Sequence, residues 1–315
     1  MRVLITGAAG NMGSLLARSL LGSGHTLRLM FHRRQLPAEL AAQPEVEPAR
    51  ADLDRRESLP AACEGVECIV HFAGLLFAPW PERFLQRTNV EYVRNLVEAA
   101  LAQGVGKFIL VSFPHVEGES TPERPARGLP GGKPTSVHAR TRLEAEKVVF
   151  TACAGRPMAA VALRAGMVYA RGVLMLDAAR WLMRRRLLHV WRRPTWIHPL
   201  ALPDFLVAAR AAIESPGASG IYNLTDDGPL TLQTFLDRVA EHWGFPRPLR
   251  LPEWTFFAAA LAVESFAWVL RTPAPLTRDF MRIGMASYVA DNSRMKQELL
   301  PGLRYPTLEH GLALL

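Results

Sequence analysis

Short apolar runs alternate along the chain with stretches whose apolar positions repeat at helical spacing. The runs are rich in Val, Ile and Leu and end at glycine or polar residues, as buried strands do; they cover 2–6, 26–31, 66–74 and 107–112. Between them, apolar positions follow a helical period at 11–22 and 83–103. Strands that alternate with helices, without two-residue hairpin turns, predict an α/β fold with a doubly wound parallel sheet.

The first strand ends in a glycine-rich turn, and a helical pattern follows at once. Gly7 permits the tight turn, Gly10 lets the backbone approach a phosphate, and Gly13 lets the helix pack on the strand. The helix N-terminus then presents free N–H groups and a partial positive charge to an anion. This strand–turn–helix context favours a dinucleotide-binding loop over an ordinary glycine-rich turn, with Ala9, Asn11 and Met12 as further contacts.

The end of the second strand indicates which dinucleotide the loop binds. A site that prefers NAD carries an acidic residue there to hold the ribose 2′-hydroxyl, whereas this chain has Phe31 followed by His32, Arg33 and Arg34. Cations at this place suit a 2′-phosphate, so we expect NADP, with NAD as the second choice. A solvated loop of two arginines is the other interpretation.

Composition narrows the class of protein. The 315 residues are 49% hydrophobic and 21% charged, which indicates a folded chain of one large α/β domain or two smaller ones. Three cysteines without a C-x-x-C pair argue against disulfides, and nine histidines without H-E-x-x-H spacing predict no metal. A strand that begins at Arg2 leaves no room for a secretory leader, so a cytoplasmic protein is expected.

The net charge of +8 looks at first like a nucleic-acid signal. However, only four of the 37 basic residues are lysine, and such an arginine excess is more typical of a GC-rich genome than of a DNA-binding surface. We therefore expect no nucleic-acid partner. The charge still favours anionic ligands in a cleft.

Several further motifs follow the glycine loop in a fixed order along nearly the whole chain. They are Asp52-Leu53, His71-Phe72-Ala73-Gly74, Thr88-Asn89-Val90, Ala165-Gly166-Met167-Val168-Tyr169, Ile197-His198-Pro199 and Tyr288-Val289-Ala290-Asp291. In this order they resemble the extended (atypical) short-chain dehydrogenases/reductases, in the branch of NAD-dependent epimerases, 3β-hydroxysteroid dehydrogenases and dihydroflavonol reductases.

The resemblance implies a Rossmann-type sheet with a smaller C-terminal α/β substrate lobe. It divides the chain into a nucleotide domain, 1–168, and a lobe, 169–315, with part of 196–226 returning to the main sheet as a strand at 221–224. The Pro/Gly-rich segment 117–134 is expected as a loop beside the cofactor, or as a lid. Implied cofactor contacts beyond the glycine loop are Asp52, Leu53, Phe72, Ala73, Gly74, Val111 and Arg142, and implied substrate contacts are Phe113, Tyr169 and Trp181.

The resemblance fails at the catalytic signature. The family uses a tyrosine with a lysine four residues later, and none of the five tyrosines here has lysine at that distance. Counting back from Leu143-Glu144-Ala145-Glu146 places His138 at the tyrosine position and Arg142 at the lysine position. The serine position falls on Phe113, with Ser112 one residue earlier, and Asn89 matches the family asparagine. His138 could donate a proton near neutral pH, while Arg142 could hold ribose hydroxyls.

Each of these residues also has a structural interpretation. His138 could face solvent at a helix start, Ser112 could bond backbone at a strand end, and Asn89 could cap a helix bend and order a water. The predicted function is NADPH-dependent reduction of a hydrophobic or aromatic small molecule with this atypical site. A catalytically silent NADP-binding redox sensor or assembly factor is the alternative, because loss of the tyrosine fits both.

Three other stretches bear on partners. Arginines and tryptophans at 180–193 could form a ligand wall or lie on an anionic membrane, and a solvated basic helix is the other interpretation. The stretch 254–270 is apolar almost all round, and we expect burial in the small lobe ahead of a peripheral membrane contact or a subunit interface. The helices at 83–103 and 137–153 resemble a pair through which family members dimerise, although Arg87, Arg94 and Arg142 interrupt their apolar faces, so a homodimer is one expected state.

Overall fold

A seven-stranded parallel sheet forms the centre of the molecule. The computed structural model describes residues 1–74, 80–272, 274 and 276–315. The strand order is β11-β6-β5-β4-β1-β2-β3, and every neighbouring pair is parallel. The strands are β1 (Arg2–Thr6), β2 (Thr26–Phe31), β3 (Val46–Arg50), β4 (Cys68–His71), β5 (Lys107–Ser112), β6 (Ala159–Ala165) and β11 (Gly220–Leu224). The predicted doubly wound sheet is confirmed, and β11 returns to it beside β6, as expected for 221–224.

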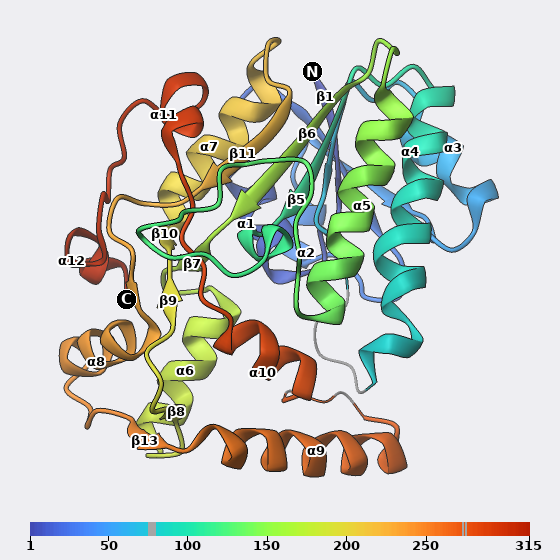
Figure 1. Ribbon diagram of the computed structural model, residues 1–315. Coiled ribbons are helices and arrows are strands. Elements are labelled where there is room, and N and C mark those ends of the chain that lie inside the picture. The colour runs from blue at the N-terminus through green and yellow to red at the C-terminus, as the bar shows by residue number, and fades with distance from the viewer. Residues whose placement is uncertain (75–79, 273, 275) are drawn as a thin grey trace.

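Helices cover both faces of this sheet (Figure 1). One face carries α3 (Leu59–Cys63), α4 (Tyr92–Ala102) and α5 (Val137–Cys153), which pack on one another; the other carries α1 (Asn11–Leu20), α2 (Ala38–Ala41) and α7 (Leu202–Glu214). Each layer buries its own apolar core against the sheet. The strands are apolar on both sides because both faces are covered.

In two apolar stretches the observed elements differ from those that the sequence pattern predicts. The run at 66–74 pairs only over β4, because residues 72–74 leave the sheet to approach the glycine loop. The helix expected at 83–103 begins as a 3-10 turn (Pro81–Arg83), continues as a π-helix over Gln86–Glu91 and becomes α-helical only in α4. Periodicity alone did not reveal this wider turn, since the π segment covers only six residues within a longer helical pattern.

The second half of the chain builds the lobe beyond the carboxyl ends of the strands (Figure 1). Helix α11 (Ser293–Glu298) is an exception and lies beside β11, where Arg294 donates to the Ile221 carbonyl. The helices of the lobe are α6 (Leu174–Arg184), α8 (Leu232–His242), α9 (Glu253–Leu270), α10 (Arg278–Met285) and α12 (Leu308–Gly311). Three small sheets link them, formed by β7 (Met167–Tyr169) with β10 (Pro199–Ala201), β8 (His189–Trp191) with β13 (Leu249–Leu251), and β9 (Trp196–Ile197) with β12 (Leu230–Thr231). The boundary at residue 168 stays a prediction.

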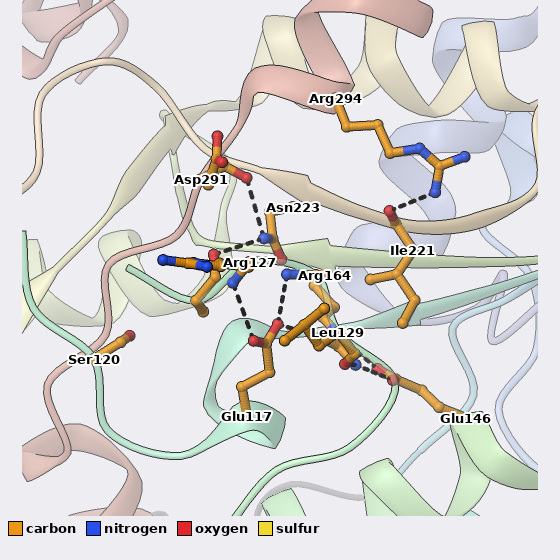
Figure 2. A network of polar contacts seen from close by, with 12 residues as sticks. Glu117, Ser120, Arg127, Leu129, Glu146, Arg164, Ile221, Asn223, Asp291 and Arg294 are labelled. Atoms are coloured by element: carbon orange, nitrogen blue, oxygen red, sulfur yellow. Dashed lines mark hydrogen bonds and ion pairs between the residues drawn. The ribbon is translucent and has the colours of Figure 1, made fainter. Parts of the chain in front are cut away.

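A buried arginine holds the Pro/Gly-rich segment 117–134 to the sheet (Figure 2). Arg164 on β6 is fully buried and donates two hydrogen bonds to the Glu146 carboxylate of α5, at 3.1 and 2.6 Å. It also pairs with Glu117 and donates to the Leu129 carbonyl. One cation thus pairs with two carboxylates from different elements.

The same segment is fixed further along its length. The Ala126 N–H donates to the Val289 carbonyl at 2.8 Å, and Ser120 exchanges hydrogen bonds with the Val289 backbone. Asn223 on β11 donates to the Ala126 carbonyl. With anchors at both ends, the segment is a fixed wall of the fold in this structure, which argues against the lid.

Substitution of Arg164 should test whether its ion pairs hold the segment 117–134 to the sheet. Arg164→Met leaves the buried Glu146 carboxylate and the partly buried Glu117 carboxylate without their shared cation, so the free energy of unfolding in urea should fall by roughly 3–5 kcal/mol. The exposed pair Arg210–Glu214 is the matched control, and Arg210→Ala should cost about 1 kcal/mol or less. A loss below about 1 kcal/mol for Arg164→Met would show that the network does not hold the segment.

Candidate functional site

The glycine loop brings three pieces of backbone together without intervening side chains. Gly7 has a φ of +69°, and a Cβ there would lie 2.9 Å from the Ala73 N atom. A Cβ on Gly13 would lie 2.4 Å from the Gly7 carbonyl oxygen. The N-cap of α1, Gly10, has no side-chain cap, and its first turn has no acidic residue. Its N–H groups can therefore meet a diphosphate, and the loop fits the dinucleotide that the sequence predicts.

Asn11 has a second role that sequence reasoning missed. Its side chain donates to the Gly172 carbonyl at 2.7 Å and accepts from the Leu174 N–H at 3.0 Å. The first residue of α1 thereby holds the start of α6. The glycine loop and the lobe are directly linked at this point.

His71 at the end of β4 supports the loop rather than titrating. Its Nδ1 lies 2.8 Å from Thr6 Oγ1, which also accepts from the Ala73 N–H at 3.4 Å. Burial, with a smaller contribution from the Arg142 charge, lowers the pKa of His71 to about 3. The neutral ring therefore tethers β4 to β1 and positions Phe72, Ala73 and Gly74 beside Gly7.

Polar atoms without partners gather at the carboxyl end of β5 and on the two helices beside it. Arg142 is 6% exposed, and its Nε and Nη1 have no partner among the described residues; the same holds there for Asn89 Oδ1, Ser112 Oγ and Thr88 Oγ1. A Cβ on Gly74 would lie 3.0 Å from Arg142 Nη2 and 3.7 Å from Asn89 Oδ1, so these two side chains meet in front of Gly74. Buried groups of this kind normally bind something, and ribose hydroxyls match them.

The Arg142 charge survives its burial. Desolvation lowers the pKa of Arg142 to about 10, and Glu146 opposes that shift, so the guanidinium stays charged at neutral pH. Because Arg142 is buried, it does not interrupt the outward face of α5, contrary to the sequence-based reading of the dimer helices. Beside it, Asn89 lies on the π-helix and donates to Thr141 Oγ1 at 3.0 Å. The wider turn directs a second orphaned group to the same place.

His138 lies at the start of α5 within a group of rings. Its centroid is 5.3 Å from that of Phe113, which lies 5.2 Å from His115, and His115 in turn lies 4.3 Å from Tyr288. The Asp279 carboxylate accepts from the N–H groups of Val137 and His138, which attaches α10 to the helix start. The ring is 9% exposed, so the solvent-facing interpretation is wrong. His115 and Asp279 were missed because both are distant in the sequence from the motif at 138–142, and only the fold brings them beside it.

This environment overturns the expectation that His138 titrates near neutral pH. Burial first, then the charges of Arg142 and His115, lower the pKa of His138 to about 3. The imidazole is therefore neutral at pH 7 and can donate or accept a hydrogen bond. It is not a cationic acid there.

The predicted cofactor residues beyond β2 and β3 lie at the surface. His32 Nε2 is 3.3 Å from the Asp52 carboxylate, while Arg33 and Arg34 are exposed and form no ion pair within the described part of the chain. Leu53 is partly buried, and its carbonyl accepts from Asn95. Phe72 and Val111 are also partly buried, at the ends of β4 and β5.

Two predicted substrate residues lie apart from the orphaned cluster. Tyr169 is 1% exposed in the core, packs edge-on against Phe235 and donates to the Thr307 carbonyl. Trp181 is 52% exposed on α6, with the Arg185 guanidinium 4.0 Å above its ring. Neither belongs to the group of residues around Arg142. Among the described residues, no cluster of His, Cys, Asp and Glu could hold a metal.

Comparison with known proteins identifies the family. The model of the NAD dependent epimerase/dehydratase family matches residues 3–193. The 2-alkyl-3-oxoalkanoate reductase of Stenotrophomonas maltophilia is 28% identical over 261 residues, 78% of this chain and 77% of that protein. The 3-diazoavenalumate denitrifying reductase of a Streptomyces species is 30% identical over 295 residues, 86% of this chain and 88% of that protein.

The fold comparison agrees. The crystal structure of the human epimerase family protein SDR39U1 with NADPH superposes with a TM-score of 0.77 at 17% identity, covering 99% of this chain and 98% of that one. The comparisons and the glycine loop together indicate an enzyme that uses a nicotinamide dinucleotide. The chain belongs to the NAD dependent epimerase/dehydratase family of extended short-chain dehydrogenases/reductases.

Proposed function

We propose that the protein is an NADP(H)-dependent reductase of a hydrophobic or aromatic carbonyl compound, with an atypical catalytic site at His138 and Arg142. The observation that carries the proposal is the buried, charged Arg142 whose Nε and Nη1 lack partners beside Asn89 and Ser112. Both relatives reported above are named as reductases, which supports the reaction class.

Residues of this chain account for each part of the cofactor. The α1 N-terminus would hold the diphosphate, Asp52 and Leu53 the adenine side, and Arg33 and Arg34 the 2′-phosphate. Arg142 and Asn89 offer a donor and an acceptor to the nicotinamide ribose. When bound, the reduced nicotinamide supplies a hydride to the carbonyl carbon, and the oxygen takes a proton from water.

The ring group determines how the substrate is held. Phe113 gives an apolar surface where the family has a serine, which suits an aromatic or aliphatic substrate. Neutral His138 can donate one N–H to the substrate oxygen and stabilise the charge that develops there. In this role His138 acts as a hydrogen-bond donor and does not transfer its proton to the substrate. Ser112 Oγ, which has no partner among the described residues, is a second donor for the same oxygen.

The relative affinities for NADPH and NADH test whether Arg33 and Arg34 bind the 2′-phosphate. Calorimetry should show that NADPH binds at least about tenfold tighter than NADH, because a charge-assisted contact to the 2′-phosphate contributes roughly 1.5–3 kcal/mol. Arg33→Ala/Arg34→Ala should remove most of the preference without weakening NADH. The exposed Arg156, in the turn that follows α5, provides the control, Arg156→Ala. Equal affinities in the parent protein would rule the arginine pair out.

Arg142 allows a test that separates binding from folding. Arg142→Met should weaken NADPH by at least about tenfold, since the guanidinium is the charged donor to the ribose. The apo protein should be no less stable than the parent, because an unpaired buried charge has been removed. Arg142→Lys should recover part of the affinity. Thermal melts without NADPH measure the stability of the apo protein, and the rise in Tm on adding NADPH measures binding. An equal rise in Tm for Arg142→Met and the parent would contradict the role of Arg142 in binding the ribose.

The pH profile tests the neutral histidine. A pKa of His138 near 3 means that the ring gains a proton only well below pH 5, so it should contribute no limb to kcat/KM between about pH 5 and pH 9. His138→Ala should lower kcat/KM by about a hundredfold and leave NADPH affinity unchanged, while His138→Gln should recover part of the rate. NADPH oxidation with a panel of hydrophobic ketones, quinones and enones is the readout. A limb near neutrality that disappears in His138→Gln would show instead that His138 is a cationic acid.

A further inference from the structure

Helix α9 has the reverse of the pattern expected for a helix packed on a soluble protein. The positions it buries against the lobe are Ala260, Glu264 and Ala267. Phe256 and Phe257 near its start pack partly buried on the core. The other large apolar side chains are mostly exposed: Trp254 is 70% exposed, Phe266 67% and Val269 69%, and Leu261, Trp268 and Leu270 are also exposed. The predicted burial of 254–270 is therefore wrong. Large apolar patches exposed in this way mark interaction surfaces.

Helix α9 carries two charged residues, and both are paired. Glu264 is 1% exposed, and its carboxylate accepts from the Arg278 backbone N–H and from Arg278 Nε at 2.6 Å. Glu253 at the helix start is partly exposed and pairs with Arg193 at 2.9 Å. No other charged residue occurs between Glu253 and Leu270. The outer face of α9 beyond its first residue is therefore uncharged and mostly apolar, with Ser265 as an exposed polar residue.

Arginines surround one end of this helix. Strand β13 leads into α9 and pairs with β8, and the Arg192 N–H donates to the Leu251 carbonyl two residues before α9 begins. Residues 181–193 and 247–272 contain eight arginines, no lysine and no acidic residue other than Glu253 and Glu264: Arg184, Arg185, Arg186, Arg192, Arg193, Arg247, Arg250 and Arg271. Figure 1 shows α9 along the lower edge of the molecule, with α6, β8 and β13 at its start.

We propose that α9 docks this protein onto an anionic lipid surface, lying in the plane of the headgroups with its apolar face toward the acyl chains. The arginines beside α9 complement anionic headgroups, and its apolar face complements the hydrocarbon layer beneath them. The tryptophans near its two ends, Trp254 and Trp268, suit the interface.

Two other placements of α9 fit the structure less well. The helix is long and apolar enough by composition to cross a membrane, but Glu264 and Arg278 hold it flat against α10. A second copy of the chain seated on α9 with the two helices parallel would bring the same arginine-rich segments close together. An anionic bilayer offers acyl chains to the apolar face of α9 and negative headgroups to the arginines beside it.

Vesicle flotation tests the proposal with the full-length protein. We expect binding to phosphatidylcholine vesicles that contain about 30% phosphatidylglycerol, little binding to pure phosphatidylcholine, and weakening when salt rises from about 0.1 M to about 1 M. Phe266→Asp/Trp268→Asp should lower the bound fraction at least about tenfold. Arg184→Glu/Arg185→Glu should remove the dependence on phosphatidylglycerol.

A matched control is available on another exposed surface. Val207 on α7 is 51% exposed and Leu129 is 58% exposed, so Val207→Asp/Leu129→Asp changes charge and apolar area comparably and should leave vesicle binding unchanged. NADPH affinity should be equal in all variants, which shows that they fold. No binding by the parent protein, or equal binding by Phe266→Asp/Trp268→Asp, would overturn the proposal. So would a lipid-free dimer in light scattering that this variant converts to a monomer.

Discussion

The close approach of three backbone segments around Gly7 is the constraint on which the site depends. The Gly13 Cα lies against the Gly7 carbonyl, and Gly7 lies against the Ala73 backbone, at distances that no side chain could share. This brings the α1 N-terminus and the end of β4 to one point. The neutral His71 holds the arrangement through Thr6, and Asn11 extends it to the lobe. The glycine loop and the start of α6 in the lobe are thereby linked by short polar contacts.

Two buried arginines, Arg164 and Arg142, lie on the side of the sheet that α5 covers, and they differ in their hydrogen bonds. Arg164 is fully satisfied by two carboxylates, and its effect is to fix a long irregular segment against the sheet. Arg142, one turn from Glu146 on α5, keeps two nitrogens without partners in the described structure. The difference in hydrogen bonding separates a structural cation from one available to a ligand. The same comparison explains why Arg142 is the stronger candidate for function.

The proposed site contains a group of packed rings: Phe113, His115, His138 and Tyr288. Such packing removes water from His138 and, with the nearby guanidinium, suppresses its protonation. An environment that disfavours charge on the ring favours a role in hydrogen bonding and apolar substrates. Reduction remains compatible with this arrangement because the hydride comes from the cofactor.

The sequence by itself determined the parallel sheet, the glycine loop and the limits of α5, since strand runs, helical periods and glycine positions are local features. Motif spacing also placed His138 and Arg142 next to each other on one helix. Tertiary structure alone decided the protonation of His138, because its pKa depends on His115 and on burial from distant segments. It also decided which face of α9 is covered. Composition records that the helix is apolar, whereas the Glu264–Arg278 pair, made with a later helix, turns its small residues inward and its tryptophans outward.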